Sequence, residues 1–386
     1  MLQALKNALR LRLRGPLAEL ARRLPLSFMP RQNLGNAIDV EGRDVTVDAM
    51  SASRVTVPPL PEPHEREYRA LLADGQRLHE ADIPVRIAVE VRDAVVAMPE
   101  SIALRRGRIL RESLPHDHAL DTVLFLKDWF RPRPEGTIGA KAGFLLTIPL
   151  ARNYHLWVHY ALPRLLFWER LPDRGDVAIL IPEDAPGFVT GALEIYRRGF
   201  PELKVEVVPR SRATVERLIV AEPMSVEDLP NPQAVDWLRR TFVPEPVEAT
   251  RSILVSRKAA LEREVLNENE LFESLAPLGF ERFDPGRASF AEQIQVFSTA
   301  SRIVAPHGAA LANLAFAPAG AHVVEIVGGS HFFGCFRFLA AEIGAHYDAV
   351  AGTTQGPHLT VDATQRAEIV RLLEADEGSL KGVEAQ

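Results

Sequence analysis

The stretch RIVAPHGAALANLAFAPAGAHVVEIV, residues 302–327, decides the fold class of this chain. Residues 303–306 and 322–327 are short apolar runs of strand length, and residues 309–316 between them have helical character. A helix that connects two strands of one sheet makes those strands parallel. The uncharged strand 303–306 also suits a sheet that helices cover on both faces.

The same alternation continues on both sides of this stretch. Further strands are predicted at 252–256, 282–284 and 346–350, and further helices at 268–278, 290–301 and 333–343. Five strands that alternate with four helices predict an α/β fold with a doubly wound parallel sheet. We expect a last helix, 364–374, to lie back on the first domain, followed by a disordered acidic tail.

The N-terminal half repeats the α/β pattern less regularly. Strands are predicted at 94–98, 143–150, 177–181, 205–208 and 217–220, and helices at 154–168 and 189–198, after an irregular stretch, 29–92. A proline-rich stretch, 223–246, marks the domain boundary, because 386 residues exceed the roughly 250–300 that one core supports. The chain therefore divides into N-terminal helices (1–28), an α/β domain (29–245), a Rossmann-like domain (246–360) and a helix with an acidic tail (361–386).

The composition excludes several classes of function. A formal net charge of −6 and an aromatic content of 7% do not suit binding to nucleic acid. The single cysteine, Cys335, excludes an internal disulfide and favours the cytoplasm. The chain has neither a Gly-x-Gly-x-x-Gly nor a P-loop sequence, which argues against an ordinary dehydrogenase or P-loop enzyme. Because no ligand cluster accompanies His116-Asp117-His118, we expect no metal.

Residues 1–26 differ from the rest of the chain in being basic and amphipathic. They carry six lysine and arginine residues against the lone acid Glu19, with leucines at helical spacing. Such a helix can lie on the anionic inner face of the plasma membrane, or it can pack on the rest of the protein. We therefore expect a cytoplasmic protein, either with peripheral membrane contact through residues 1–26 or with these residues packed on the rest of the chain.

Polar residues follow the predicted strands at their carboxyl ends, where open α/β sheets bind ligands. His307, Gly308 and Ala309 form a small turn that opens a helix, and free N–H groups there suit a phosphate. The alternative is a tight turn with a structural histidine. Glu325 ends the next strand, where a carboxylate can bind two ribose hydroxyls or pair with an arginine.

Cations follow the strand 252–256. Ser256, Arg257 and Arg263 lie in this loop, and arginine is a planar, bidentate donor for a diphosphate. The alternative is a solvated loop with scattered charges. Two Asn/Ser-x-x-Glu patterns nearby, which begin at Asn267 and Ser289, predict capping boxes and not nucleophiles.

Two histidines of the N-terminal half are candidates for a general base. His155 and His159 lie four residues apart, near the start of the helix predicted at 154–168, and share one helix face. A histidine with a pKa near neutrality can accept a proton from a hydroxyl group, so either of the two, His155 or His159, is a candidate for the base. The alternative is that both rings are hydrogen-bonded core residues.

A set of residues in a fixed order carries a resemblance to a known family. The set is Ser256-Arg257, Arg263, Asn267-Glu268, Glu292-Gln293, His307-Gly308-Ala309, Asn313 and Glu325. With it, the chain resembles glycosyltransferase family 61 over roughly residues 140–350. Bacterial members of that family are often described as capsular polysaccharide biosynthesis proteins.

The resemblance implies a GT-B architecture, in which two Rossmann-like domains face each other across a cleft. It implies inverting, metal-independent transfer of a sugar from a nucleotide diphosphate donor, usually a UDP-sugar, to a saccharide or lipid-linked saccharide acceptor, with no cofactor. The absence of an Asp-x-Asp sequence agrees with this. The acceptor would lie against the N-terminal domain. The donor would bind Ser256, Arg257, Arg263, His307, Gly308, Ala309, Asn313 and Glu325.

One departure from the family pattern concerns the base. The family often has a histidine, and an acid four residues later, just before Leu-Pro-Arg. When Leu162-Pro163-Arg164 is aligned without a gap, these positions fall on Leu156 and Tyr160, and His155 is offset by one. Either the helix has a shifted register or the base lies elsewhere. The alternative function is a non-catalytic nucleotide-sugar-binding or scaffold protein of a polysaccharide assembly system.

Overall fold

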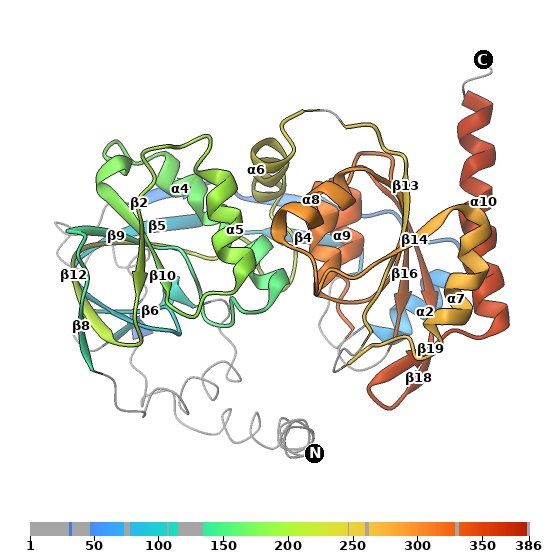
Figure 1. The fold of residues 1–386 in the computed structure, drawn as a ribbon, viewed down its shortest axis with the longest axis horizontal. Helices are drawn as coiled ribbons and strands as arrows, with labels where there is room; N and C mark the ends of the chain where they lie inside the picture. Colours follow the sequence, from blue (N-terminus) through green and yellow to red (C-terminus); the bar gives the residue numbers. More distant parts are fainter. Residues whose placement is uncertain are drawn as a thin grey trace.

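The structure, a computed structural model, describes residues 31–32, 47–72, 78–105, 108–114, 134–245, 247–258, 262–328 and 332–383. These residues form two large sheets with helices packed around them, so the predicted α/β class is confirmed (Figure 1). The helices predicted within residues 1–28 and the triplet that begins at His116 lie outside the described residues.

The C-terminal sheet is the parallel sheet that the sequence predicts. Its strands, in spatial order, are β14 (Phe280–Phe283), β13 (Arg251–Val255), β15 (Ala300–Pro306), β16 (His322–Val327) and β17 (His346–Ala351). All neighbouring pairs are parallel. β14, the next strand along the chain after β13, lies on one side of β13, and the later strands of this sheet, β15 to β17, lie on the other side.

Helices cover both faces of this sheet. One face carries α8 (Phe290–Ser298), α9 (Cys335–Glu342) and the 3₁₀ helix η7 (Ala309–Phe316), and the other carries α7 (Glu268–Leu275) and α10 (Ala363–Val383). Because side chains alternate along a strand, Val323 belongs to the first layer and Val324 to the second. Successive apolar residues of these strands therefore contribute in turn to two buried clusters, one on each face of the sheet.

The C-terminal helix differs from its prediction in length and in place. It continues past residue 374 to Val383, and residues 384–386 lie outside the described range. Ile369, Leu372 and Leu373 pack with Val304 and Val324, so α10 covers the C-terminal sheet and not the first domain. No helix among the described residues is both long and apolar enough to span a membrane.

The N-terminal sheet is only partly parallel. Its parallel part consists of β12 (Arg212–Ala221), β9 (Ala142–Leu145), β10 (Val177–Pro182) and β11 (Val205–Val208). The remaining strands are β5 (Arg86–Ala97), β2 (Val47–Met50), β6 (Ile102–Arg105), β7 (Arg108–Leu110), β1 (Arg31–Gln32) and β8 (Glu135–Thr137). β5 pairs antiparallel with β12, β2 and β6, whereas β8 pairs parallel with β12 and β1 pairs parallel with β7, so a mixed extension is added to the parallel strands.

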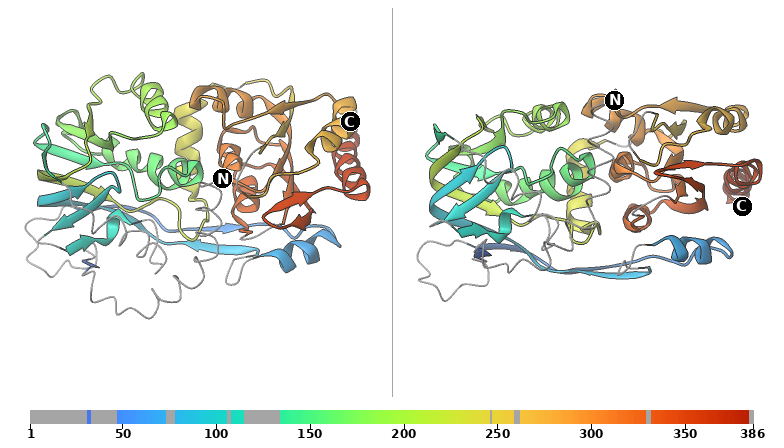
Figure 2. Two further views of the ribbon diagram at one scale, coloured as in Figure 1. Left: turned by 60° about the horizontal axis from the view of Figure 1, so that its bottom comes forward. Right: turned by 90° about the horizontal axis from the view of Figure 1, so that it is seen from below.

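Part of the stretch predicted as irregular reaches across to the C-terminal sheet. The strands β3 (Ser53–Thr56) and β4 (Glu80–Ile83) pair antiparallel, and the helix α2 (His64–Leu71) lies between them in the sequence (Figure 2). Tyr68 of α2 packs on Phe332, and Arg337 of α9 lies 3.0 Å from the carboxylate of Glu65. These residues therefore pack with the C-terminal half, although the sequence assigned them to the domain 29–245.

The two halves share one buried apolar cluster. Trp157 and Phe144 of the N-terminal half belong to the same cluster as Phe290 and Phe316 of the C-terminal half. The helix α6 (Pro232–Phe242), which is part of the predicted boundary 223–246, lies between the sheets in Figure 1 and contributes to this cluster. The described residues thus form a continuous core across the predicted boundary.

Candidate functional site

Two segments leave the C-terminal sheet on neighbouring strands, at its carboxyl edge. Ser256 and Arg257 follow β13, and His307 and Gly308 follow β15. Since the strand order reverses at β13, the crevice between these two strand ends is the usual ligand position of an open α/β sheet. The structure therefore brings together two groups of residues that the sequence assigned to one phosphate site.

Arg257 and Gly308 are in close contact. A Cβ atom built on Gly308 would lie 1.6 Å from Arg257 Nη1, so the guanidinium occupies the space of a side chain at position 308. The φ of Gly308 is 163°, an extended conformation that any residue adopts. A side chain at position 308 would therefore displace the Arg257 guanidinium, whereas the backbone angles at this position admit any residue.

The two arginines of the loop lie near each other. Burial and the neighbouring charge of Arg263 lower the pKa of Arg257 to about 10. Arg257 Nη2 donates to the backbone carbonyl of Glu262 at 3.1 Å, which fixes the direction of the guanidinium. Two cations held this close repel each other, and a bound anion of high charge such as a diphosphate would relieve the repulsion.

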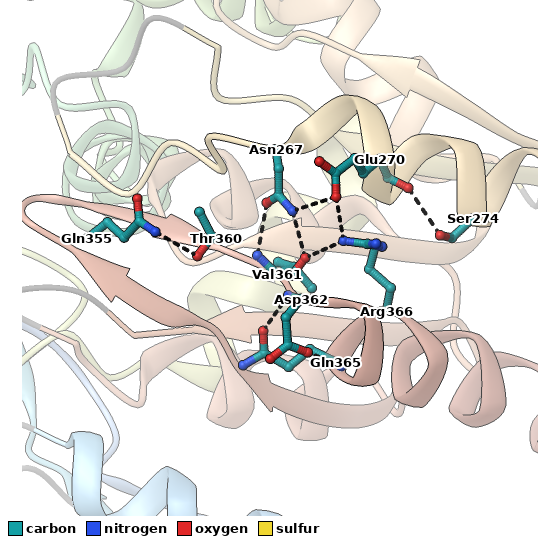
Figure 3. A network of polar contacts seen from close by, with 9 residues as sticks. All are labelled: Asn267, Glu270, Ser274, Gln355, Thr360, Val361, Asp362, Gln365 and Arg366. Carbon is teal, nitrogen blue, oxygen red and sulfur yellow. Dashed lines mark hydrogen bonds and ion pairs between the residues drawn. The ribbon is translucent and has the colours of Figure 1, made fainter.

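The loop that carries Arg263 is anchored to the strand β19 (His358–Thr360) and the residues that follow it. Arg263 N donates to Pro357 O at 2.6 Å, and the backbone of Arg263 is left-handed, with a φ of 59°. Figure 3 shows how Asn267 closes this loop: its side chain exchanges two hydrogen bonds with the backbone of Val361, at 2.7 and 2.9 Å. A segment about ninety residues away in the sequence therefore supports the position of Arg263.

The same bonds explain why one predicted capping box is absent. The Asn267 side chain makes no capping bond to α7, because Val361 uses it. The predicted box at Ser289 and Glu292 is confirmed, with both reciprocal bonds present.

Ser256 holds the start of the loop that carries the two arginines. Its hydroxyl group donates a hydrogen bond to the Glu268 carboxylate at 2.8 Å.

His307, Glu325 and Tyr347 form a buried chain of hydrogen bonds. The backbone N–H of His307 donates to Ile326 O at 3.0 Å, which continues the β15–β16 pairing and brings the ring beside Glu325. His307 Nδ1 lies 2.5 Å from Glu325 Oε1, and the Tyr347 hydroxyl group donates to Glu325 Oε2 at 2.5 Å. Glu325 is 0% exposed, so the structure places its carboxylate behind His307 and not at a surface where it could bind ribose hydroxyls directly.

Asn313 also lies in the interior. Its amide group donates to Gln293 at 2.9 Å and to Ala310 O at 3.0 Å, and its oxygen accepts from the Tyr154 hydroxyl group at 2.6 Å. These bonds join η7 to α8 and to the N-terminal half. Ala309, in contrast, is partly exposed in the first turn of η7. The N–H groups of a first turn have no partner within the helix.

His155 comes directly before a π-helical turn, η3 (Leu156–Ala161). The N–H of Leu162 donates to Trp157 O, five residues earlier, whereas an α-helix would pair residues four apart. A π-turn accommodates one extra residue in a helix and is frequent at functional sites. This π-turn lies directly after His155, in the segment where His155 is offset by one from the family's histidine position.

A carboxylate lies beside His155. Asp228 Oδ1 is 3.8 Å from His155 Nε2, and the Tyr160 hydroxyl group donates to the same oxygen at 2.9 Å. Tyr160 stands at the acid position of the family pattern. In this chain the carboxylate at that place comes from Asp228, 68 residues further along, to which Tyr160 is hydrogen-bonded. The backbone of Asp228 is left-handed, with a φ of 63°, and its N–H also donates to Tyr160.

The second histidine of this helix has a structural role. His159 is 1% exposed, and its Nε2 lies 3.0 Å from Ala312 O in the C-terminal half. Burial, with a smaller contribution from His155, lowers the pKa of His159 to about 3. His159 is therefore neutral across the physiological range and ties the two halves together, whereas His155 keeps 12% of its side chain exposed.

Phe336 of α9 connects the two parts of the candidate site. Its ring centroid lies 5.4 Å from that of His155 and 5.2 Å from that of His307. Burial, and then the charges of Asp228 and Glu325, raise the pKa of the neighbouring Cys335 thiol. The histidine of the N-terminal half and the turn after β15 thus face one shared ring.

Residues 154–324 match the family model of Glycosyltransferase 61. This match supports glycosyltransferase family 61, and glycosyltransferase activity in general, for the segment that contains His155, Arg257 and His307. The matched segment begins one residue before His155 and ends one residue before Glu325. No curated protein matches the chain.

Three residues around the candidate site were not predicted from the sequence. Asp228 lies within the proline-rich stretch that we interpreted as a boundary, and no pattern near it indicated a site. Phe336 and Tyr347 lie beyond the matched segment, in an apolar helix and an edge strand. Aromatic residues flank Cys335 in the sequence, and this pattern is typical of a buried cluster.

Proposed function

We propose that this protein is an inverting, metal-independent glycosyltransferase with a GT-B-like arrangement of its two halves. The donor is a nucleotide diphosphate sugar with UDP as the nucleotide, and the acceptor is a saccharide or lipid-linked saccharide of surface polysaccharide biosynthesis, as in capsule assembly. The observation that carries this proposal is that His155 and His307 contact the same ring, Phe336. A base from one half then lies next to the phosphate turn of the other half.

The donor contacts come from the carboxyl edge of the C-terminal sheet. Arg257 and Arg263 bind the diphosphate, and the close approach at Gly308 lets Arg257 and the N–H groups at Ala309 act on the same phosphate. His307 contributes the ring nitrogen that Glu325 does not use. These groups stabilise the negative charge that develops on the leaving diphosphate, in the place of a metal ion.

Three further residues support these contacts from behind. Ser256 holds the first turn of the loop through Glu268, Asn313 fixes η7, and Glu325 orients His307. We propose them as positioning residues, because their polar atoms are buried and already bonded within the protein. This assignment is narrower than the direct donor contact that the resemblance implies.

His155 acts as the base in this proposal. It takes the proton of the acceptor hydroxyl group, and the hydroxyl oxygen attacks the anomeric carbon from the face opposite the diphosphate. The bond between that carbon and the diphosphate oxygen breaks as the new glycosidic bond forms, so the configuration inverts. Asp228 stabilises the positive charge that His155 gains, from 3.8 Å away.

A nucleotide-sugar-binding or scaffold protein without transfer activity is the second candidate. The observation that favours it is that leucine and tyrosine stand at the family's histidine and acid positions, at Leu156 and Tyr160. Any transfer of sugar to an oligosaccharide or glycolipid acceptor excludes this candidate.

We further propose that residues 1–26 make peripheral contact with the cytoplasmic face of the membrane. Membrane fractionation of a variant without these residues tests this contact.

Thermal shift with UDP, GDP, CMP and ADP, each with magnesium and with EDTA, tests the donor site. A ligand at about 100 times its dissociation constant stabilises by roughly 2.7 kcal/mol, which raises the melting temperature by a few degrees. We expect a shift with UDP that persists in EDTA. A shift that requires magnesium would contradict metal-independent binding.

Turnover of a UDP-sugar panel with saccharide acceptors then tests catalysis. Arg257→Ala should lower turnover at least about tenfold, because it removes a charge-assisted contact to the leaving group. Arg240→Ala is the matched control, since Arg240 lies on the surface of α6 and pairs only with Asp236 among the contacts of the described residues. Equal turnover in the two variants would refute the role of Arg257.

A further inference from the structure

Three polar side chains gather at the amino ends of β16 and β17. The parallel register pairs His322 with His346 and Val324 with Asp348. Because side chains alternate along a strand, His322, His346 and Asp348 all belong to the face that α10 covers, whereas Glu325 belongs to the opposite face. The cluster is therefore separated by the sheet from the site described above.

The geometry of this cluster is compact. His322 Nε2 lies 2.9 Å and His346 Nδ1 lies 3.7 Å from the same oxygen, Asp348 Oδ2, and the three ligand atoms all lie within 4.8 Å of one another. In a tetrahedral zinc site with bonds of about 2.0–2.2 Å, neighbouring ligand atoms lie roughly 3.3–3.5 Å apart. The observed distances bracket this value, so small side-chain rotations would suffice to bring all three atoms to one ion.

The cluster opens onto a pocket between α2 and α10. The pocket is lined by His64, His346, Asp348, Glu368 and Arg371, with residues 61–63 before α2 and further residues of α10. His64 Nε2 lies 3.2 Å from Glu368 Oε1, and Arg371 neutralises part of the Glu368 charge at 2.6 Å. The open side of the cluster thus faces a carboxylate and a further imidazole, which suit the fourth position of a metal ion.

We propose that His322, His346 and Asp348 form a site for a zinc-type divalent transition metal that fastens the edge strand β17 to β16, with its fourth position toward α2 and α10. Two imidazole nitrogens and one carboxylate oxygen suit Zn²⁺ or Co²⁺, whereas Mg²⁺ and Ca²⁺ prefer oxygen ligands alone. The site has a structural role and lies apart from the reacting groups, so the proposed transfer remains metal-independent. This inference does not depend on the proposed function.

Metal titration of the tag-free, EDTA-treated full chain tests the site. We expect one Zn²⁺ per chain by calorimetry and metal analysis, a rise in melting temperature of a few degrees, and a visible spectrum of tetrahedral type with Co²⁺. His346→Ala should weaken Zn²⁺ binding at least tenfold, and this variant should fold because His346 is exposed on an edge strand. Asp348→Asn should weaken binding to a similar degree.

A histidine outside the cluster provides the matched control. His358→Ala, on β19, should keep the Zn²⁺ affinity of the unchanged chain. The thermal shift with UDP should be the same in His346→Ala as in the unchanged chain, which separates this test from that of the donor site. Absence of binding at millimolar Zn²⁺ or Co²⁺, or equal affinity in His346→Ala and His358→Ala, would overturn the proposal.

Discussion

The guanidinium of Arg257 fills the space in which a side chain at position 308 would lie. Gly308→Ala should therefore displace Arg257 and lower turnover at least about tenfold, with a similar loss of UDP affinity. The unfolding free energy should change by less than about 1 kcal/mol, because alanine adopts the extended backbone of Gly308 and the displaced atoms end a flexible side chain. Gly187→Ala, with no atom within 4 Å of the added Cβ, is the control. Full UDP affinity in Gly308→Ala would contradict the close approach.

Asp228→Asn isolates the charge beside His155. Asparagine has the same shape and tolerates the left-handed backbone of Asp228, so the melting temperature should stay within about 2 °C. Turnover should fall on the order of 10- to 100-fold, because the imidazolium formed during proton transfer loses its carboxylate. Asp93→Asn, at an exposed position with a φ of 52°, controls for the substitution itself. If both variants keep full turnover, Asp228 has no role in the transfer.

Arg263→Asn separates stability from donor binding. The left-handed conformation at position 263 is unfavourable for arginine and better tolerated by asparagine, so thermal stability should be unchanged or slightly higher. Affinity for UDP should fall about 10- to 100-fold, since one charge-assisted contact to the diphosphate is lost. Calorimetry and thermal unfolding of one preparation measure both effects. Unchanged affinity would remove Arg263 from the donor site.

The pH dependence of stability should contain a contribution from His159. The folded protein keeps this ring neutral down to a pKa of about 3, whereas the unfolded chain takes up a proton below about pH 6.5. The unfolded state therefore binds more protons between these two values, so the unfolding free energy decreases as the pH falls through this window, by up to about 1.4 kcal/mol per pH unit. Above about pH 6.5 the contribution is constant.

Urea unfolding between pH 4.5 and 7.5 measures this slope. His159→Gln keeps a donor for the Ala312 carbonyl and removes the titrating ring, so its unfolding free energy should fall less steeply with acid than that of the unchanged chain. Two parallel pH profiles would show that His159 does not titrate in this way.

The C-terminal sheet could be predicted from the sequence because its signals are local. The strand–helix alternation around residues 303–327 and the capping box at Ser289 each depend on residues a few positions apart, and both are present in the structure. The box at Asn267 was wrong for a long-range reason, since Val361 takes the same side-chain atoms. The residues near Asn267 are compatible with a capping box or with no box. The long-range contact with Val361 determines that the box does not form.

The candidate site was predictable only in part. Arg257 and His307 lie where parallel strands end, and the sheet topology alone brings such residues together. Asp228 reaches His155 through a bend with two left-handed residues inside a proline-rich stretch, which no periodic pattern reveals. In the same way, residues 322, 346 and 348 became one cluster only once the register of β16 and β17 was known.

The contact of α2 with α9 has a consequence for the order in which the chain matures. A ribosome makes Pro58 and Glu65 early, and their partner Arg337 follows 279 residues after Pro58. Until then, Tyr68 can pack only against nearby leucines such as Leu60, because its aromatic partners Phe332 and Tyr347 are also late in the chain. The side of the protein next to His307 therefore closes late during synthesis, and a chain released before residue 332 has neither a complete C-terminal sheet nor this contact with α2.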